Sequence, residues 1–256
     1  MSGQQWDDPI PDAIRESFTD WCVDLPNLEH LVIPRSYFSH LVSEVELHMF
    51  GDASQDAFCA VAFLRARKHS SETPLVLFVV GKARVALMKP LSIPKLELQA
   101  ALLVTRLKEK ILAAFTIHID REYMWTDSTT VLQWLASTEK QPVFVANRVA
   151  EILEVTTIDK WFHVGTADNP ADAGTRGLSA ASLTESIWVR GPDFLRSNGW
   201  PFKPSPESQK IPLKAPSFDP DNINVLSLNA VTSVKPPVID WEKYSSFSKL
   251  KRVVAY

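Results

Sequence analysis

The stretch that decides the fold is REYMWTDSTTVLQWLAST, residues 121–138, where an apolar run stops at an aspartate and hydroxyl residues follow. REYMWTD is rich in aromatic and apolar residues and predicts a short strand that ends at Asp127. STTVLQWLAST predicts a short helix, because serine and threonine are residue types that cap helix N-termini. The flanks of this strand–helix unit decide which fold it belongs to.

The residues before this stretch predict three strands and a long helix. EVELHMF (44–50) alternates polar and apolar residues as a half-buried strand does, and AFCAVAFLRAR (57–67) and TPLVLFVVGKARVA (73–86) follow at hairpin-like spacing. The next segment, IPKLELQAALLVTRLKEKILAAF (93–115), has Pro94 at a helix-opening position. Its apolar stripe consists of Leu96, Ala100, Leu103, Leu107 and Ile111.

The residues after it predict one more helix and one more strand. PVFVANRVAEILEV (142–155) is the helix, and KWFHV (160–164) is the last strand. The apolar side of this helix is expected to carry Ala146, Val149, Ala150 and Leu153. Three strands, a helix, a strand, two helices and a strand make a mixed α/β layer fold. Its core is expected to include Trp125, Trp134 and Trp161, whereas the basic residues near 65–68 and 82–84 are expected to be solvated.

Three regions of the chain differ in composition. Residues 1–43 are acidic, contain scattered tryptophans and prolines, and predict one or two short helices. Residues 44–200 hold nearly all of the periodic structure and form the expected folded domain. Residues 201–256 are crowded with prolines, as in PFKPSPESQKIPLKAP (201–216), and are expected to be a poorly ordered linker.

Composition narrows the functional classes. With 27 basic and 30 acidic residues and a net charge of −3, the chain lacks the basic footprint of a dedicated nucleic-acid binder, although a local patch can exist within a neutral total. Cys22 and Cys59 are too few for a disulfide framework and too isolated for a zinc site, so no disulfide-linked partner is expected. The N-terminus has no apolar signal-peptide core, and no run reaches the ~18 apolar residues of a membrane span. We therefore expect an intracellular protein with no membrane partner.

Four acidic residues occupy the ends of the predicted elements. Asp52 lies where the first strand ends, Asp127 where the fourth ends, Glu97 in the first turn of the long helix, and Asp172 just past the last strand. The strand ends at one edge of an α/β sheet are a usual place for a site. Carboxylates that converge there repel one another by ~4 kcal/mol per pair at about 4 Å and an effective dielectric of about 20, so cations must neutralise them. Hard oxygen ligands select Mg²⁺ or Mn²⁺, and two such ions clamp the attacking and leaving oxygens of a phosphodiester.

Five motifs follow one another in a telling order: FGDAS (50–54), IPKLELQAALL (93–103), WTDSTTVLQWL (125–135), FVANRVAEI (144–152) and WFHVGTADNPAD (161–172). Together they resemble the type 1 ribonuclease H domain of long-terminal-repeat retrotransposon polyproteins, and the BEL/Pao group most closely. The resemblance covers about residues 45–200, including WVRGPDFL (188–195) after the core. It implies a ribonuclease H-like mixed five-stranded sheet, with three antiparallel strands and then parallel strands, flanked by helices.

The resemblance also implies residue roles and partners. Asp52, Glu97, Asp127 and Asp172 match the family's four metal-binding carboxylates, and His163 matches the histidine that assists catalysis or product release. The implied activity is Mg²⁺- or Mn²⁺-dependent hydrolysis of the RNA strand of RNA/DNA hybrids during retroelement reverse transcription, with two ions bound. Residues 1–43 resemble the connection segment after reverse transcriptase, and 201–256 the linker toward integrase. The reverse transcriptase and integrase regions of one polyprotein are thus implied partners, and a cytoplasmic retroelement particle is the implied location.

The sequence departs from the family pattern at one place, and other interpretations of the residues and of the function stay open. ADAGTRG (171–177) is more glycine-rich than the family's usual helix start after the last aspartate. Taken singly, each acid is an ordinary capping or turn residue and His163 a packed strand residue; the ordered set favours a site. An inert or repurposed ribonuclease H-like fragment that binds nucleic acid or protein is the first functional alternative. An integrase- or transposase-like nuclease is the second, although such enzymes use three acids in another order, usually behind a zinc-binding segment.

Overall fold

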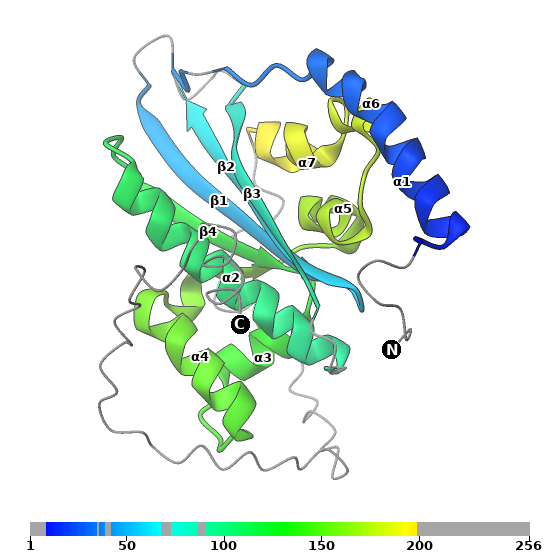
Figure 1. The fold of residues 1–256 in the computed structure, drawn as a ribbon. Coiled ribbons are helices and arrows are strands. Elements are labelled where there is room, and N and C mark those ends of the chain that lie inside the picture. Colours follow the sequence, from blue (N-terminus) through cyan, green and yellow to red (C-terminus); the bar gives the residue numbers. More distant parts are fainter. Residues whose placement is uncertain (1–8, 35, 39–41, 68–72, 87–90, 199–256) are drawn as a thin grey trace, which may run out of the picture. The chain divides into compact units, whose positions relative to one another are not determined.

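A mixed five-stranded sheet forms the centre of the computed structural model, which describes residues 9–34, 36–38, 42–67, 73–86 and 91–198 (Figure 1). The strands lie in the order β3-β2-β1-β4-β5. The first three are antiparallel neighbours, and β4 and β5 run parallel to β1, so the predicted arrangement of the sheet is confirmed. The strands are β1 (Glu44–Ala53), β2 (Ala57–Arg67), β3 (Leu75–Val85), β4 (Arg121–Thr126) and β5 (Trp161–His163).

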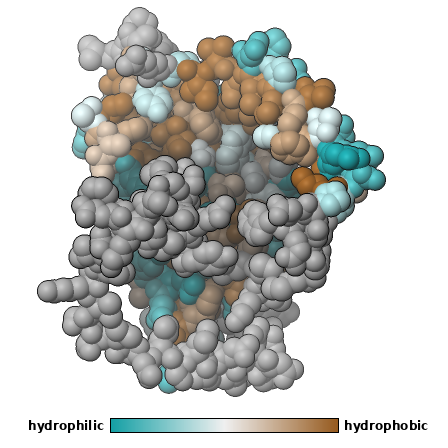
Figure 2. Space-filling view, in the orientation of Figure 1, coloured by the Kyte–Doolittle hydropathy of each residue, from teal (hydrophilic) through white to brown (hydrophobic). Residues whose placement is uncertain are grey.

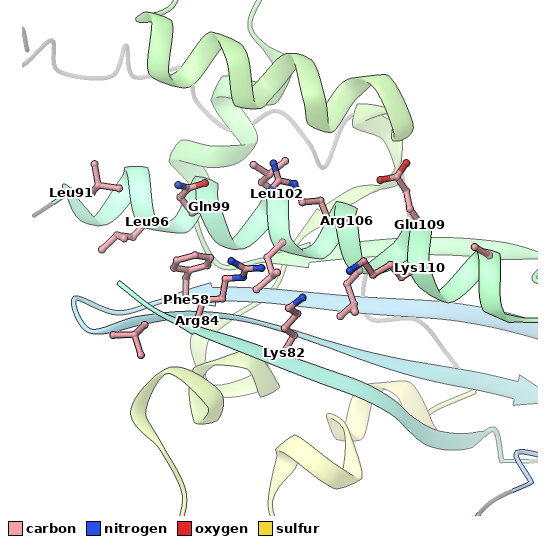
Figure 3. Close-up of a pocket in the computed structure, with 14 residues that line it drawn as sticks. Phe58, Lys82, Arg84, Leu91, Leu96, Gln99, Leu102, Arg106, Glu109 and Lys110 are labelled. Carbon is pink, nitrogen blue, oxygen red and sulfur yellow. The ribbon is translucent and has the colours of Figure 1, made fainter. Parts of the chain in front are cut away.

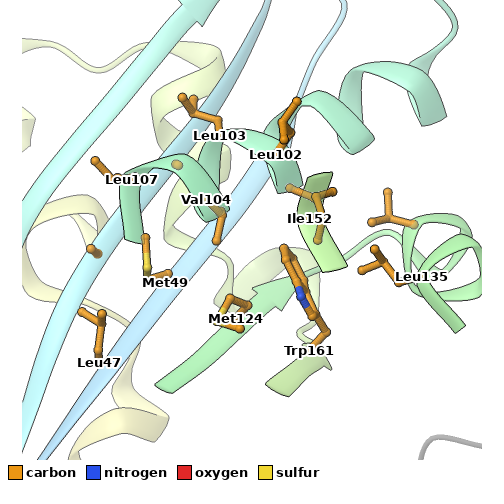
Figure 4. Close-up of a cluster of buried hydrophobic side chains, with 14 of the residues drawn as sticks. Leu47, Met49, Leu102, Leu103, Val104, Leu107, Met124, Leu135, Ile152 and Trp161 are labelled. Carbon is orange, nitrogen blue, oxygen red and sulfur yellow. The ribbon is translucent and has the colours of Figure 1, made fainter. Parts of the chain in front are cut away.

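Helices α2, α3 and α4 cover one face of the sheet (Figure 1). They span Ile93–Ala114, Thr129–Ala136 and Val143–Val155. All five residues of the predicted α2 stripe are buried. Three of them, Leu103, Leu107 and Ile111, pack with residues of β1 and β4 and with Trp161 in one apolar cluster (Figure 4). In α4 the predicted apolar side was wrong in part: Val149 is buried as predicted, together with Val145 and Ile152, whereas Ala150 and Leu153 are exposed. The buried face of α4 is the one that turns toward α2 and α3. The sequence alone does not identify this face, because alanine and valine residues are mixed along the helix.

The other face of the sheet is covered by α5 (Pro170–Arg176), α7 (Ile187–Arg190) and the 3₁₀ turn η4 (Asp193–Arg196). Aromatic residues fill this layer, with Phe50, Phe63 and Trp125 fully buried beneath it. Two short 3₁₀ turns, η2 (Ile158–Lys160) and η3 (Thr166–Asp168), flank β5 on its two sides. Because both faces of β1 are covered, this strand is buried along nearly its whole length, and the expectation of a half-buried strand was wrong.

Polar residues that the alternating pattern predicted to face solvent are buried between β1, β2 and the segment after α7. Arg65 of β2 is 2% exposed, not solvated as predicted, and its Nη1 lies 2.5 Å from Glu46 Oε2. Its Nε donates to the Leu195 carbonyl at 2.7 Å and its Nη2 to the Ser197 carbonyl at 3.1 Å. This guanidinium therefore ties the segment after α7 to the sheet.

The N-terminal segment forms α1 (Asp12–Asp24) and η1 (Leu25–His30), as the predicted short helices require. The carboxylate of Asp24 accepts hydrogen bonds from the backbone N–H groups of Ala180 and Ala181, so it caps α6 (Ala180–Leu183). No residue of α1 is buried. Apolar surface gathers in the upper part of Figure 2, where Figure 1 places α1, α6 and α7.

The chain divides into two units, residues 1–214 and 215–256. The predicted linker, 201–256, lies outside the described residues. The predicted boundaries at residues 43 and 200 therefore stay predictions. None of the helices in the described part of the chain combines the length and the apolar character that crossing a membrane requires.

Candidate active site

Two of the predicted acids lie side by side at the ends of neighbouring parallel strands. Gly51 of β1 is the register partner of Thr126 of β4, and Asp52 and Asp127 are the residues that follow them. Asp52 is 6% exposed. Parallel pairing brings the carboxyl ends of both strands to one edge, so this juxtaposition follows from the topology of the sheet.

Glu97 comes to the same edge from α2. The helix begins at Ile93, with Pro94 in its first turn, and that turn contains no acidic residue; the predicted first-turn position of Glu97 was therefore wrong, and the residue lies in the next turn. Close packing of α2 on β1 depends on Gly51. A Cβ at this position would lie 2.9 Å from Val104 Cγ2 and 3.3 Å from the Ala100 carbonyl oxygen.

The segment after β5 supplies the remaining two predicted residues. His163 pairs with Thr126 in the sheet register, and its Nε2 lies 3.2 Å from the Asp127 carbonyl oxygen, with the side chain exposed. Asp172 lies in the first turn of α5, where its Oδ1 is 2.9 Å from Nη2 of Arg176.

Asn169 explains why GTADNPAD turns as it does. It is 1% exposed and N-caps α5, since its Oδ1 accepts from the Ala171 N–H at 3.2 Å. Its Nδ2 donates to the Gly51 carbonyl at 3.2 Å, which joins the loop to β1 beside Asp52. Pro170 then begins the helix at a position that needs no N–H partner. The loop therefore delivers Asp172 to the acidic edge.

The carboxylates are electrostatically coupled. Burial raises the pKa of Asp52 above its ordinary value, and the charges of Asp127 and Asp172 raise it further, against a hydrogen bond from Thr175. Burial likewise raises the pKa of Glu97, as do the charges of Asp127 and Asp52, against a hydrogen bond from Ser128. Asp52 is thus coupled to all three of the other acids, and the negative charges at this edge of the sheet repel one another.

Three hydroxyl groups, which the sequence reasoning did not assign to the site, donate to these carboxylates. Ser128 Oγ donates to Glu97 Oε2 at 2.6 Å, and Thr166 Oγ1 donates to Asp127 Oδ2 at 3.0 Å. Thr175 Oγ1 lies 2.8 Å from Asp52 Oδ2. Ser128 had been predicted as a helix cap, and it also fills that role by accepting from the Val131 N–H. The sequence carried no signal for the two threonines, because their partners are far away along the chain.

The donor set suits a hard divalent cation in its chemistry. Carboxylate oxygens are the ligands that Mg²⁺ and Mn²⁺ prefer. Within the residues that the structure describes, however, no three His, Cys, Asp or Glu side chains are grouped closely enough to hold a metal ion. One oxygen of each carboxylate accepts from a hydroxyl group or pairs with Arg176 in this arrangement. Metal binding would therefore require these side chains to converge.

A hollow of about 900 Å³ lies elsewhere, between α2 and the β2–β3 hairpin (Figure 3). None of the predicted site residues lines it. Its apolar floor includes Leu102 and Leu107, and four basic side chains border it: Lys82, Arg84, Arg106 and Lys110. This hollow and the coupled acids are thus different features.

Comparison with protein-family models matches residues 1–128 to the Pao retrotransposon-like RNaseH-like domain. The matched segment contains Asp52, Glu97 and Asp127 and ends before His163 and Asp172. It also includes the N-terminal segment with α1, ahead of the region in which the motifs were recognised. A comparison with curated proteins found no match.

Ribonuclease H domains of low sequence identity are among the similar solved structures. RNase H1 from the archaeon Halobacterium salinarum shares 17% identity over 56% of this chain and 100% of its own, with a TM-score of 0.33. The N-terminal RNase H domain of rv2228c from Mycobacterium tuberculosis, in a fusion with maltose binding protein, has 13% sequence identity to this chain. The match covers 57% of this chain and 100% of that one, with a TM-score of 0.34. LC11-RNase H1, in complex with an RNA/DNA hybrid, has 12% sequence identity to this chain. The match covers 50% of this chain and 91% of that one, with a TM-score of 0.31.

Proposed function

The chain belongs to the Pao retrotransposon-like RNaseH-like domain family, and from this membership we propose that it is a divalent-metal-dependent endonuclease. Its proposed substrate is the RNA strand of an RNA/DNA hybrid, hydrolysed during the reverse transcription of a retroelement. Family membership supports the class of activity, and the residues at the carboxyl edge of the sheet support its chemistry.

The observation that carries this proposal is the mutual coupling of Asp52, Glu97 and Asp127. Burial and neighbouring negative charge raise the pKa values of Asp52 and Glu97, which means that the folded chain holds carboxylates together at an energetic cost. A purely structural edge gains nothing from such repulsion. A divalent cation would relieve it, and perturbed carboxylates of this kind cluster at functional sites.

Each residue has a proposed role. Asp52, Glu97, Asp127 and Asp172 would hold two Mg²⁺ or Mn²⁺ ions. Bound there, these ions would supply an activated water and neutralise charge on the scissile phosphate. His163 is exposed beside Asp127, and an imidazole at that place is suited to assist catalysis or the release of product by moving a proton through its ring nitrogens.

The proposed partners follow from the same family membership. They are the hybrid itself and the reverse transcriptase and integrase regions of one polyprotein. The proposed place of action is a cytoplasmic retroelement particle.

The test is cleavage of a hybrid with an end-labelled RNA strand by the purified 256-residue chain, with Mg²⁺, Mn²⁺ or a chelator. We expect metal-dependent products with 3′-hydroxyl and 5′-phosphate ends. Asp127→Asn should abolish them. Asp159→Asn, an exposed acid in η2 before β5, is the matched control and should cut as the unaltered chain does.

Two results would contradict the proposal in different ways. Equal cutting of hybrid, duplex DNA and single-stranded RNA would refute hybrid specificity. Binding of hybrid without any metal-dependent cutting would instead favour an inert binding module on the same fold.

A further inference from the structure

The glycine-rich sequence after Asp172 places α5 unusually close to the sheet. A Cβ on Gly174 would lie 2.4 Å from Cys59 Sγ of β2 and 2.4 Å from the Trp188 ring of α7. Real Cβ atoms do not approach other atoms so closely, so a larger residue here requires a shift of α5 or of the Cys59 and Trp188 side chains. Gly174 thus sets the distance between α5 and the strands that lead to the acidic edge.

This distance brings Thr175 into contact with Asp52. Thr175 is 7% exposed, and its Oγ1 lies 2.8 Å from Asp52 Oδ2 and 2.9 Å from the Asp172 carbonyl oxygen. A hydroxyl has one proton to donate, and the charged carboxylate is the stronger acceptor. The carbonyl is the alternative partner within the same helical turn. Thr175 therefore links the acid of β1 to the helix that carries Asp172.

We propose that Thr175 is a positioning residue that restrains the Asp52 carboxylate at the acidic edge and thereby favours divalent-ion binding, with Gly174 allowing the approach that makes this contact possible. The inference rests on the proposed function, since it concerns the same acidic edge. It also accounts for the departure of ADAGTRG from the family pattern. Groups that hydrogen-bond to metal ligands typically change metal affinity about 10–100-fold when removed.

The test is Mn²⁺ binding to the full chain, measured by isothermal titration calorimetry without substrate. Thr175→Val keeps the shape of the side chain and removes the hydroxyl; we expect its Mn²⁺ affinity to fall about 10-fold or more. Thr175→Ser restores the hydroxyl and should restore most of the affinity. Thr105→Val is the matched control, because Thr105 is 1% exposed and its hydroxyl bonds the Ala101 carbonyl of its own helix.

A second variant tests the role of the close approach. Gly174→Ala should weaken Mn²⁺ binding in a chain that retains Thr175, because the added methyl group is expected to shift α5 away from Cys59. Circular dichroism of every variant distinguishes this local change from unfolding.

The outcomes separate the two proposals. If the unaltered chain binds Mn²⁺ in a way that Asp52→Asn abolishes, and Thr175→Val binds it equally well, the positioning role is refuted while the metal site stands. If the unaltered chain shows no binding that depends on Asp52, the proposed function fails, and the positioning role fails with it. Weakened binding in Thr175→Val without recovery in Thr175→Ser would also refute the role of the hydroxyl.

Discussion

Arg176 and Asp172 form an ion pair one helical turn apart in α5, with 2.9 Å between Nη2 and Oδ1. The guanidinium is 70% exposed and the carboxylate 27% exposed. A cation that is to be held by Asp172 must compete with this positive charge. Because exposed ion pairs contribute only about 0–1 kcal/mol, the competition is modest.

We therefore predict that Arg176→Gln strengthens Mn²⁺ binding, by no more than about 5-fold, the factor that ~1 kcal/mol allows. Calorimetric titration of the full chain measures the change. Arg190→Gln is the control, because Arg190 forms a comparable exposed ion pair with Glu185 in a different part of the chain and should leave the affinity unchanged. Weaker binding by Arg176→Gln would show that the arginine supports the acidic edge.

The raised pKa of Asp52 predicts that its charge destabilises the folded chain. A carboxyl whose folded pKa exceeds its unfolded value favours folding most below the unfolded pKa, and this contribution is lost as the pH rises through the folded pKa. At neutral pH and without divalent ions, Asp52→Asn should therefore unfold at a higher temperature than the unaltered chain. The advantage should shrink as the pH falls through the raised folded pKa of Asp52, and it should be gone below the ordinary aspartate pKa of about 3.9.

Thermal unfolding followed by circular dichroism between acidic and neutral pH measures this difference. Asp159→Asn, which alters an exposed acid outside the coupled set, should show no such pH-dependent gain. Adding Mn²⁺ should stabilise the unaltered chain and not Asp52→Asn. A lower unfolding temperature for Asp52→Asn at neutral pH would contradict the coupling.

The clamp between Arg65 and the segment after α7 makes a prediction about stability. Arg65→Met removes the nearest cation of the buried Glu46 carboxylate and the donor to the Leu195 and Ser197 carbonyls. Breaking a buried pair in this way costs about 3–5 kcal/mol of the free energy of unfolding, because an uncompensated charge remains. Urea denaturation measures the loss. Arg67→Met, on the same face of β2, is the control and should cost far less; an equal loss in both variants would show that the clamp contributes little.

The sheet was predictable because its signals are local. Alternating and apolar runs marked the strands, and the position of Asp127 after REYMWT placed an acid at a strand end before any partner strand was known. The pairing of Gly51 with Thr126 then follows from parallel topology. The face of α4 was not predictable in this way, since alanine and valine occur on several of its sides and only neighbouring helices decide which of them is covered.

Contacts between distant residues account for the rest. The alternating pattern predicts Glu46 and Arg65 as solvent-facing residues, yet Arg65 bonds carbonyl groups of Leu195 in η4 and of Ser197, more than a hundred residues away. The role of Thr175 could not be predicted from the sequence for the same reason, because its hydroxyl donates to a carboxylate 123 positions earlier. The acids could be named from motifs, whereas the hydroxyls that orient them required the fold.

The connection between α3 and α4 bears on how the chain grips a hybrid. It runs from Ser137 to Pro142 and includes one basic residue, Lys140, beside Glu139. Affinity for a phosphate backbone depends on the counterions released by lysine and arginine contacts. A chain with a net charge of −3 and no basic insertion at this place has few such contacts. We therefore predict that the isolated chain binds hybrid weakly, with a shallow dependence on salt.

The basic residues next to Glu97 are the expected exception. Lys95 lies on α2 two residues before Glu97, with its Nζ 5.8 Å from the Phe144 ring, and the Arg148 guanidinium stacks on the same ring at 3.4 Å. Lys95→Gln should weaken hybrid binding and reduce the slope of log affinity against log salt by about 1, the effect of one lost phosphate contact. Lys110→Gln, at the hollow away from the acids, should change neither quantity. Fluorescence anisotropy of a labelled hybrid across a salt series measures both.

Addition of a reverse transcriptase partner should raise the affinity of the chain for hybrid and steepen the salt dependence. Tight, salt-resistant binding by the chain alone would refute this account of substrate binding.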